Sequence, residues 1–265
     1  MPHPIRIGVG GWTYAPWRGS FFPPDLPQSQ ELAFAARALT AIEVNGTFYR
    51  TQTPATFRKW ARGTPDGFVF TLKAPRYVTS RRKLAETADG VRRFLDSGLE
   101  ELGPKLGAIN WQLPPTRAFD CADLASFLDL LPDRLNGLPL RHAIEPRHDS
   151  FHAPAFAALL TDRGIAAVQG ADGAYPEIDV ATTDFAYLRL MGTQKDEPLG
   201  YPARDLDRWA TRLRRIARDR AVFAFVISGH KTANPAAAQA LLQRLGVRIP
   251  PSPHTSPART RDTTR

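Results

Sequence analysis

Short apolar segments alternate with longer amphipathic segments along almost the whole chain, and this alternation restricts the fold more than any other feature. Eight segments are rich in apolar, β-branched and aromatic residues and are expected to be strands, at residues 5–10, 41–45, 68–73, 107–113, 140–145, 165–169, 186–190 and 221–227. Helical periodicity is found between them, at residues 55–62, 84–102, 122–131, 154–163, 206–218 and 235–245. Pro154 and Pro235 are placed as first-turn prolines. Only residues 170–184 lack a clear helical pattern.

Eight β/α alternations predict an α/β fold, a single (β/α)8 TIM barrel, with a doubly wound open sheet as the alternative. The chain has 265 residues, 43% of them hydrophobic, which is enough for one large core. Residues 1–246 are predicted to form this one domain. Residues 247–265 are rich in proline, serine and threonine and are predicted to be a disordered basic tail.

The lack of a targeting pattern and the single cysteine lead to an expectation for the cellular compartment. The amino-terminal residues carry no signal-peptide pattern, and no apolar run is long enough for a membrane span. The single cysteine, Cys121, cannot form an intramolecular disulfide. We therefore expect a cytoplasmic protein with no membrane partner.

The net charge is +9, which suggests a polyanionic partner such as nucleic acid or a phosphorylated metabolite. Three of these charges belong to the predicted tail. Arg208, Arg212 and Arg215 recur on one face of the predicted helix 206–218. This stripe could bind a nucleic-acid backbone, or it could be an ordinary solvated helix face.

Polar residues at the ends of the predicted strands indicate a site. Side chains alternate between the two faces of a strand, and the active sites of barrels lie at the carboxyl ends of the strands. Within the stretch EVNGTFYR, Glu43 and Asn45 are then expected to point inward, with Ile42 and Val44 facing the helices. The same alternation places four more polar side chains at the mouth, namely Lys73, Gln112, Arg147 and Arg189.

Two glutamates, Glu43 and Glu145, are expected to face one another across this mouth. Such a pair suits acid–base catalysis when one carboxyl stays protonated. Equally, each glutamate could pair with a neighbouring lysine or arginine in a structural network. His148 is a candidate proton shuttle next to Glu145, with a turn-capping role as the alternative.

The basic residues Lys73, Arg147 and Arg189 are expected to bind a phosphate or carboxylate group. Several aromatic residues follow the first and second strands and could stack on a base or sugar ring, or could instead close the end of the core, namely Trp12, Tyr14, Trp17 and Tyr49.

Four motifs carry a family resemblance: GVGGWTYAPWRGSFFPPDLP, IEVNGTFYRTQTPATFRKWARGTPDGFVFTLKAPRYVT, KLGAINWQLPPT and EPRHDSF. Together they resemble domain-of-unknown-function family 72, the YecE-like proteins. The resemblance implies a TIM barrel, related in architecture to sugar-isomerase-like and abasic-site-endonuclease-like barrels, with no settled activity. It places the family motifs on Gly11, Trp12, Tyr14, Trp17, Glu43, Asn45, Thr47, Phe48, Tyr49, Lys73, Gln112, Pro114, Pro115, Glu145, Arg147 and His148.

This chain departs from the family pattern on two strands. Many relatives have a histidine where Met191 follows Leu190, and many have an F-N-N tip on the eighth strand where this chain reads FVISGHK. Whether His230 and Lys231 replace that motif is left open by the sequence.

The leading hypothesis is an enzyme, a metal-independent hydrolase, lyase or isomerase, acting on a small phosphorylated sugar or nucleotide. Neither a P-loop nor a dinucleotide fingerprint is present, so no cofactor is expected. The alternative is a non-catalytic nucleic-acid-binding module. The expected catalytic residues are Glu43, Glu145 and His148, and the expected substrate-binding residues are Trp12, Tyr14, Asn45, Tyr49, Lys73, Gln112, Arg147 and Arg189.

Overall fold

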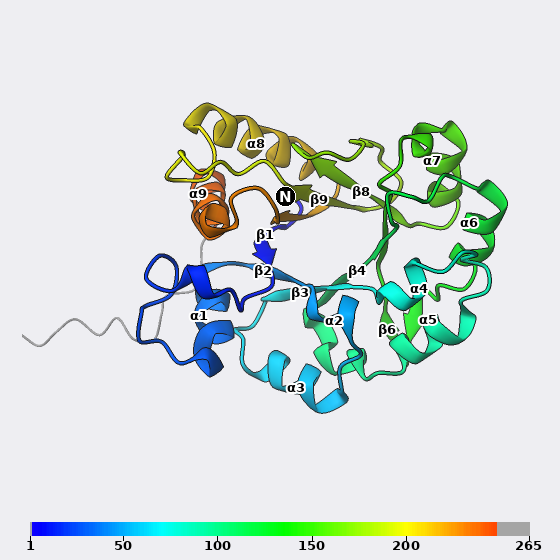
Figure 1. Cartoon of the computed structure of the whole chain (residues 1–265), viewed down its shortest axis with the longest axis horizontal. Coiled ribbons are helices and arrows are strands. Elements are labelled where there is room, and N and C mark those ends of the chain that lie inside the picture. Colours follow the sequence, from blue (N-terminus) through cyan, green and yellow to red (C-terminus); the bar gives the residue numbers. More distant parts are fainter. Residues whose placement is uncertain (1, 248–265) are drawn as a thin grey trace, which may run out of the picture.

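Eight parallel strands form a closed barrel in the computed structural model, which describes residues 2–247 (Figure 1). Around the barrel the strands follow the order β1-β10-β9-β8-β7-β4-β3-β2. They are β1 (Ile5–Gly10), β2 (Ala41–Val44), β3 (Val69–Lys73), β4 (Leu106–Gln112), β7 (His142–Glu145), β8 (Ala166–Ala171), β9 (Phe185–Leu190) and β10 (Ala221–Val226). The predicted (β/α)8 barrel is confirmed.

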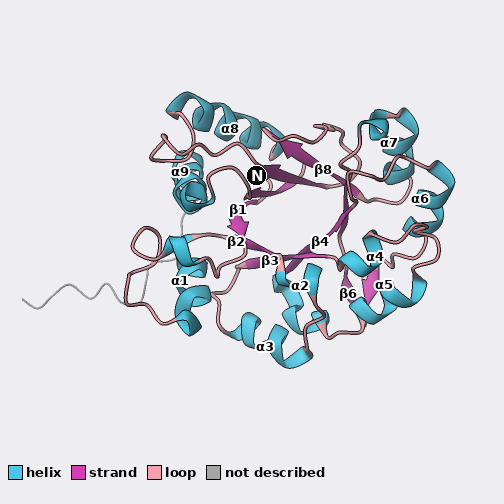
Figure 2. Cartoon of the chain, viewed as in Figure 1, coloured by secondary structure: helices cyan, strands magenta, loops and turns pink. Residues whose placement is uncertain are grey.

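Helices surround the barrel on its outside (Figure 2). They are α1 (Glu31–Ala38), α2 (Gly46–Tyr49), α3 (Pro54–Arg62), α4 (Arg76–Thr79), α5 (Ala88–Leu95), α6 (Cys121–Leu128), α7 (Pro154–Thr161), α8 (Ala203–Ile216) and α9 (Asn234–Leu245). Proline occupies the first turn of α7 and α9, as predicted. Residues between β8 and β9 form no helix, also as predicted. None of the helices in residues 2–247 has the length and apolar character needed to cross a bilayer.

Several elements differ from the sequence prediction, and helices α1, α2 and α4 were not predicted. The helix expected at 84–102 is divided into α5 and the 3-10 segment Leu99–Lys105, because Gly98 between them has a φ of 94°. A small hairpin, β5 (Arg134–Leu135) with β6 (Leu138–Pro139), was not predicted. Its turn residues Asn136 and Gly137 both have positive φ, so the Asn-Gly pair was the signal for it.

The interior of the barrel has an apolar layer and a polar layer. Inward side chains in the first part of the strands form a separate buried apolar cluster, which includes Val69, Phe185 and Phe223. Outward residues such as Ile42 and Val44 belong to the larger core beneath the helices. The predicted alternation is therefore confirmed for β2, and Glu43, two residues after the interior Ala41, lies in the polar layer near the carboxyl ends of the strands.

The strand expected at 41–45 ends one residue earlier, at Val44. Asn45 has helical backbone angles and begins α2. The hydroxyl of Thr47 donates to the carbonyl of Lys73 at 2.7 Å, which fixes α2 over the end of β3. The predicted tail, 247–265, lies outside the described residues apart from Val247.

Candidate functional site

Arg189 lies at the centre of the polar layer and bridges the two glutamates. Its Nε and one terminal nitrogen donate to both carboxylate oxygens of Glu43, at 3.1 and 3.0 Å. Its other terminal nitrogen donates to Oε1 of Glu145 at 2.6 Å. The Tyr187 hydroxyl also donates to Glu43, at 2.7 Å. All four side chains are buried, so Arg189 takes the position between the carboxylates.

Glu145 has further partners on neighbouring strands. Arg147 donates two hydrogen bonds to Oε1, at 2.9 and 2.8 Å, and the Asn110 amide donates to Oε2 at 2.9 Å. Burial alone would raise the pKa of Glu145, but Arg189, Arg147 and Lys73, together with the Asn110 hydrogen bond, lower it to about 2. Glu145 is therefore ionised at neutral pH and is poorly suited to donate a proton.

This geometry favours the structural-network interpretation of the two glutamates over the acid–base interpretation. Each carboxylate is bonded to a guanidinium, and a buried carboxylate needs such a partner. Burial lowers the pKa of Arg189, but the charges of Glu145 and Glu43 outweigh it and raise this pKa above the ordinary arginine value. The three side chains therefore form one buried network of ion pairs.

Lys73 differs from its neighbours because its amine is unpaired. Within residues 2–247, Nζ forms neither a hydrogen bond nor an ion pair, and it lies 4.4 Å from the centre of the Phe48 ring. Lys73 is only 8% exposed. Burial and the nearby charge of Arg189 lower its pKa to about 8, although Glu43 and Glu145 act in the opposite direction.

A cavity of about 690 Å³ opens above this network and is lined mainly by the loops after β1, β2 and β10. Five basic side chains line it, and no Asp or Glu side chain is among the described residues of its wall. The basic residues are Arg50, Lys73, Arg147, Arg189 and Lys231. Glu43 and Glu145 lie beneath the cavity and are paired with the arginines. The wall of the cavity therefore carries a net positive charge.

Glycine and aromatic residues shape the sides of this cavity. A Cβ atom on Gly10 would lie 2.8 Å from Nδ2 of Asn45, so the glycine allows the Asn45 side chain to pack against β1. Trp12 lies in the wall and packs edge-on against Trp60 at 5.3 Å. Tyr49 is 71% exposed at the edge, so its ring is free to contact a ligand.

Besides Glu43 and Glu145 beneath it, three further predicted site residues lie outside the cavity wall. His148 accepts from the Ser150 backbone at 3.2 Å and caps the short turn Asp149–His152, which is the alternative role considered for it. Tyr14 packs on Trp17, with Lys231 above its ring. Gln112 is buried next to β7, and its Oε1 has no partner in the described part of the chain.

Two wall residues, Arg50 and Lys231, were not predicted as ligand contacts. Arg50 is the last residue of EVNGTFYR, and its charge directly after the exposed Tyr49 was the available signal. Lys231 lies in the wall after β10, whereas His230 belongs to a separate, smaller pocket near α9. Of His230 and Lys231, only Lys231 therefore joins the mouth.

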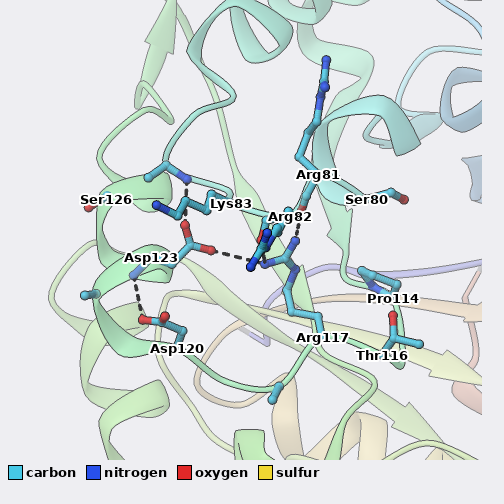
Figure 3. A pocket seen from close by; sticks show the side chains of 13 residues that line it. Ser80, Arg81, Arg82, Lys83, Pro114, Thr116, Arg117, Asp120, Asp123 and Ser126 are labelled. Atoms are coloured by element: carbon cyan, nitrogen blue, oxygen red, sulfur yellow. Dashed lines mark hydrogen bonds and ion pairs between the residues drawn. The ribbon is translucent and has the colours of Figure 1, made fainter.

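A second basic cavity lies at the rim, after β3 and β4 (Figure 3). Arg81, Arg82 and Lys83 are exposed there. Arg117 crosses the cavity wall, donates to the backbone carbonyls of Arg81 and Arg82, and pairs with Asp123 at 3.2 Å. Arg117 is therefore bonded within the protein, in contrast to Lys73.

The arginine stripe on α8 is also partly paired. Arg212 bonds to Glu177 and Asp179 at 2.7 and 3.1 Å, and Arg208 pairs with Asp205 at 3.3 Å. These contacts favour the solvated-face interpretation of α8.

Within residues 2–247, no three His, Cys, Asp or Glu side chains gather as a metal-binding group. The expectation that no tightly bound metal is needed stays a prediction, and elemental analysis of protein purified without chelator would test it. Fold and site together define a (β/α)8 barrel with a basic cavity at the carboxyl end of its strands.

The chain belongs to the family described as "Protein of unknown function DUF72", whose model matches residues 6–261. The resemblance found in the sequence is thus confirmed. The curated UPF0759 protein YunF of Bacillus subtilis is 27% identical over 158 residues, which are 57% of this chain. The match covers 54% of YunF, so the chain spans about half the length of this relative.

Solved structures of DUF72 family proteins share the fold. One from Thermotoga maritima has a TM-score of 0.72 and 22% identity, covering 93% of this chain and 100% of that chain. One from Enterococcus faecalis has a TM-score of 0.70 and 19% identity, covering 93% of this chain and 99% of that chain. At these identities the comparison establishes the barrel fold.

Proposed function

We propose that the mouth cavity binds a small anionic ligand, a phosphorylated sugar or a nucleotide, and that it does so as the substrate site of an enzyme. The observation that carries this proposal is Lys73, a buried cation without a counter-ion in the described structure. A buried charge is costly unless it is paired. A bound phosphate would supply the missing negative charge.

The neighbouring groups suit the same ligand. Arg147 and Arg189 are held by Glu145 and Glu43, so their positions are set before a ligand arrives. Arg50 and Lys231 add two more positive charges nearer the solvent. Charge-assisted hydrogen bonds from such groups are the stronger kind.

Aromatic groups support a sugar or nucleotide over inorganic phosphate alone. The exposed Tyr49 ring and the Trp12 side chain lie in the same wall as the basic residues. Aromatic rings bind sugars and bases by stacking. In this arrangement, the phosphate is bound by the cations, and the ring of the ligand contacts the aromatic residues.

Proton transfer in this proposal falls to Lys73 more readily than to the glutamates. An amine with a pKa of about 8 exchanges protons near neutral pH, whereas Glu145 stays ionised. The glutamates then serve as fixed counter-ions that position the arginines, and the reaction belongs to the metal-independent hydrolase, lyase or isomerase class.

Calorimetric titration with ribose 5-phosphate, ribose and inorganic phosphate tests the proposal. We expect both phosphate compounds to bind and ribose alone to bind far more weakly. Lys73→Met should weaken phosphate binding by about tenfold or more. Lys83→Met removes the same charge from the rim cavity and should leave the affinity unchanged.

Nucleic-acid binding is a separate outcome of the same experiments. It would be favoured if single-stranded DNA bound with an affinity that falls steeply with salt. Loss of that binding in Arg208→Gln/Arg215→Gln, with no effect of Lys73→Met, would assign the function to the basic surface and overturn the proposal.

A further inference from the structure

Lys73 combines three features that the other wall residues do not share. Its amine has no hydrogen-bond or ion-pair partner in residues 2–247, its stem is buried, and its end lines the cavity. The arginines beside it are bonded to glutamates and cannot act as nucleophiles, because a guanidinium stays protonated. Lys231, the other lysine of the wall, also lies over an aromatic ring, that of Tyr14, but it is exposed.

The surroundings of Lys73 increase the neutral fraction of its amine. Burial and the positive charges of Arg189 and Arg147 disfavour its protonated form. With a pKa of about 8, about a tenth of the Lys73 amines are neutral at pH 7, compared with less than about a thousandth for an ordinary exposed lysine. Nucleophilic lysines are activated in this way, by loss of solvent and by nearby cations.

We infer that Lys73 is a nucleophile that condenses with the carbonyl carbon of an open-chain, phosphate-bearing ligand to form a Schiff base. The inference rests on the proposed function, because the other cations of the wall are needed to hold the phosphate while Lys73 bonds to the carbonyl carbon, namely Arg50, Arg147, Arg189 and Lys231. It narrows the substrate to an anionic aldehyde or ketone, such as an open-chain sugar phosphate. It also narrows the reaction to lyase or isomerase chemistry through an imine.

The step balances without an oxidant or reductant. The nitrogen lone pair of neutral Lys73 attacks the carbonyl carbon, a C–N bond forms, and the carbonyl electron pair moves to oxygen. The two nitrogen-bound protons are then lost with this oxygen as water, and a C=N bond remains. One proton from solvent, to which the mouth is open, converts the imine to a cation.

The network beneath the cavity suits this cation. Glu43 and Glu145 are bonded to arginines and not to Lys73, but their negative charges attract its ammonium from a distance, and the iminium carries the same charge on the same nitrogen. Once formed, an iminium withdraws electrons from the neighbouring C–H or C–C bond.

Pyridoxal 5′-phosphate is a suitable probe because it carries both an aldehyde and a phosphate. The full chain is incubated with a small excess of the probe, reduced with borohydride, and mapped by mass spectrometry of its peptides. We expect Lys73 to be labelled at least about tenfold more than the exposed lysines, namely Lys59, Lys83 and Lys195. Excess inorganic phosphate should reduce the labelling of Lys73 and leave that of the exposed lysines unchanged.

Lys73→Arg separates this inference from the proposed function. The variant keeps the positive charge and should still bind inorganic phosphate, but its mouth should take no label. If the unaltered chain binds phosphate and labels only Lys231 or the exposed lysines, the Schiff-base inference is overturned and anion binding stands. If neither the chain nor the variant binds phosphate, the proposed function itself fails.

Discussion

The mouth cavity and the rim cavity both gather basic side chains, but those side chains have different surroundings. At the mouth, the charges of Arg189 and Arg147 are satisfied by buried glutamates, while Lys73 has no partner among the described residues. At the rim, Arg117 is bonded to Asp123 and to backbone carbonyls. The remaining rim cations, Arg81, Arg82 and Lys83, are exposed to water.

This contrast shows that burial, more than the number of cations, distinguishes a candidate binding site. An exposed cation is solvated and screened by salt, so it gains little from an additional anion. A buried cation has lost its water, and a ligand that replaces the lost interaction is bound more strongly. The two cavities therefore make different predictions for stability and binding.

The largest expected change in stability is caused by Glu43→Gln. This change leaves Arg189 with one carboxylate and weakens its bond to Tyr187, so we expect a loss of about 3–5 kcal/mol in the free energy of unfolding. Urea denaturation measures it. Glu101→Gln makes the same substitution in the solvent-exposed pair with Arg58 and should leave the midpoint nearly unchanged. Equal midpoints for the two variants would contradict the buried-network account.

Acid should destabilise the mouth through Glu145. Its pKa is about 2 in the folded chain and near 4.5 when unfolded, so the unfolded state binds the proton first as pH falls. The stabilisation is present above about pH 4.5 and is lost toward pH 2, by about 3 kcal/mol. Stability measured from pH 6 to 2.5 should fall less steeply in Glu145→Gln. Identical slopes in both proteins would show that Glu145 titrates normally.

Lys73→Met should stabilise the chain at neutral pH, because it removes an unpaired buried cation. The folded-state pKa of Lys73 is about 8, below its ordinary 10.5, so the unfolded state binds more protons between these values. Stability of the unaltered chain should therefore rise through this window by about 2–3 kcal/mol relative to Lys73→Met. Denaturant melts at pH 7 and pH 10 test this, and a constant difference would contradict it.

The smallest effect is expected at the rim. Replacing Arg81, Arg82 and Lys83 together by glutamine removes three exposed charges without breaking an internal bond of the mouth. Stability should change by less than about 0.5 kcal/mol. Phosphate affinity at physiological salt should change by less than about twofold, since salt screens these exposed charges. A larger loss of affinity would move the binding site to the rim.

The barrel and its inward positions could be predicted from sequence because both depend on local periodicity. Apolar runs marked the eight strands, and the alternation along β2 correctly placed Glu43 inside. Another local signal, a proline in the first turn, correctly marked the starts of α7 and α9. Where backbone conformation breaks the pattern, as at Gly98, the predicted helix was too long.

The pairing of charges could not be predicted, because it depends on contacts between distant parts of the chain. Arg189 reaches Glu43 across 146 positions of sequence, and nothing local shows that it lies between the two glutamates. For His148, the deciding contact was instead with Ser150, two residues away. The lack of a partner for the buried amine of Lys73 can therefore be recognised only from the three-dimensional arrangement of all these groups.

An anomalous diffraction experiment on a crystal soaked in tungstate tests the central claim most directly, because tungstate is a tetrahedral dianion like phosphate. The account predicts the strongest peak in the mouth cavity, within hydrogen-bonding distance of Lys73 Nζ and next to Arg147. A tungstate peak that appears only between Arg81, Arg82 and Lys83 at the rim, or an empty mouth at saturating tungstate, would contradict it.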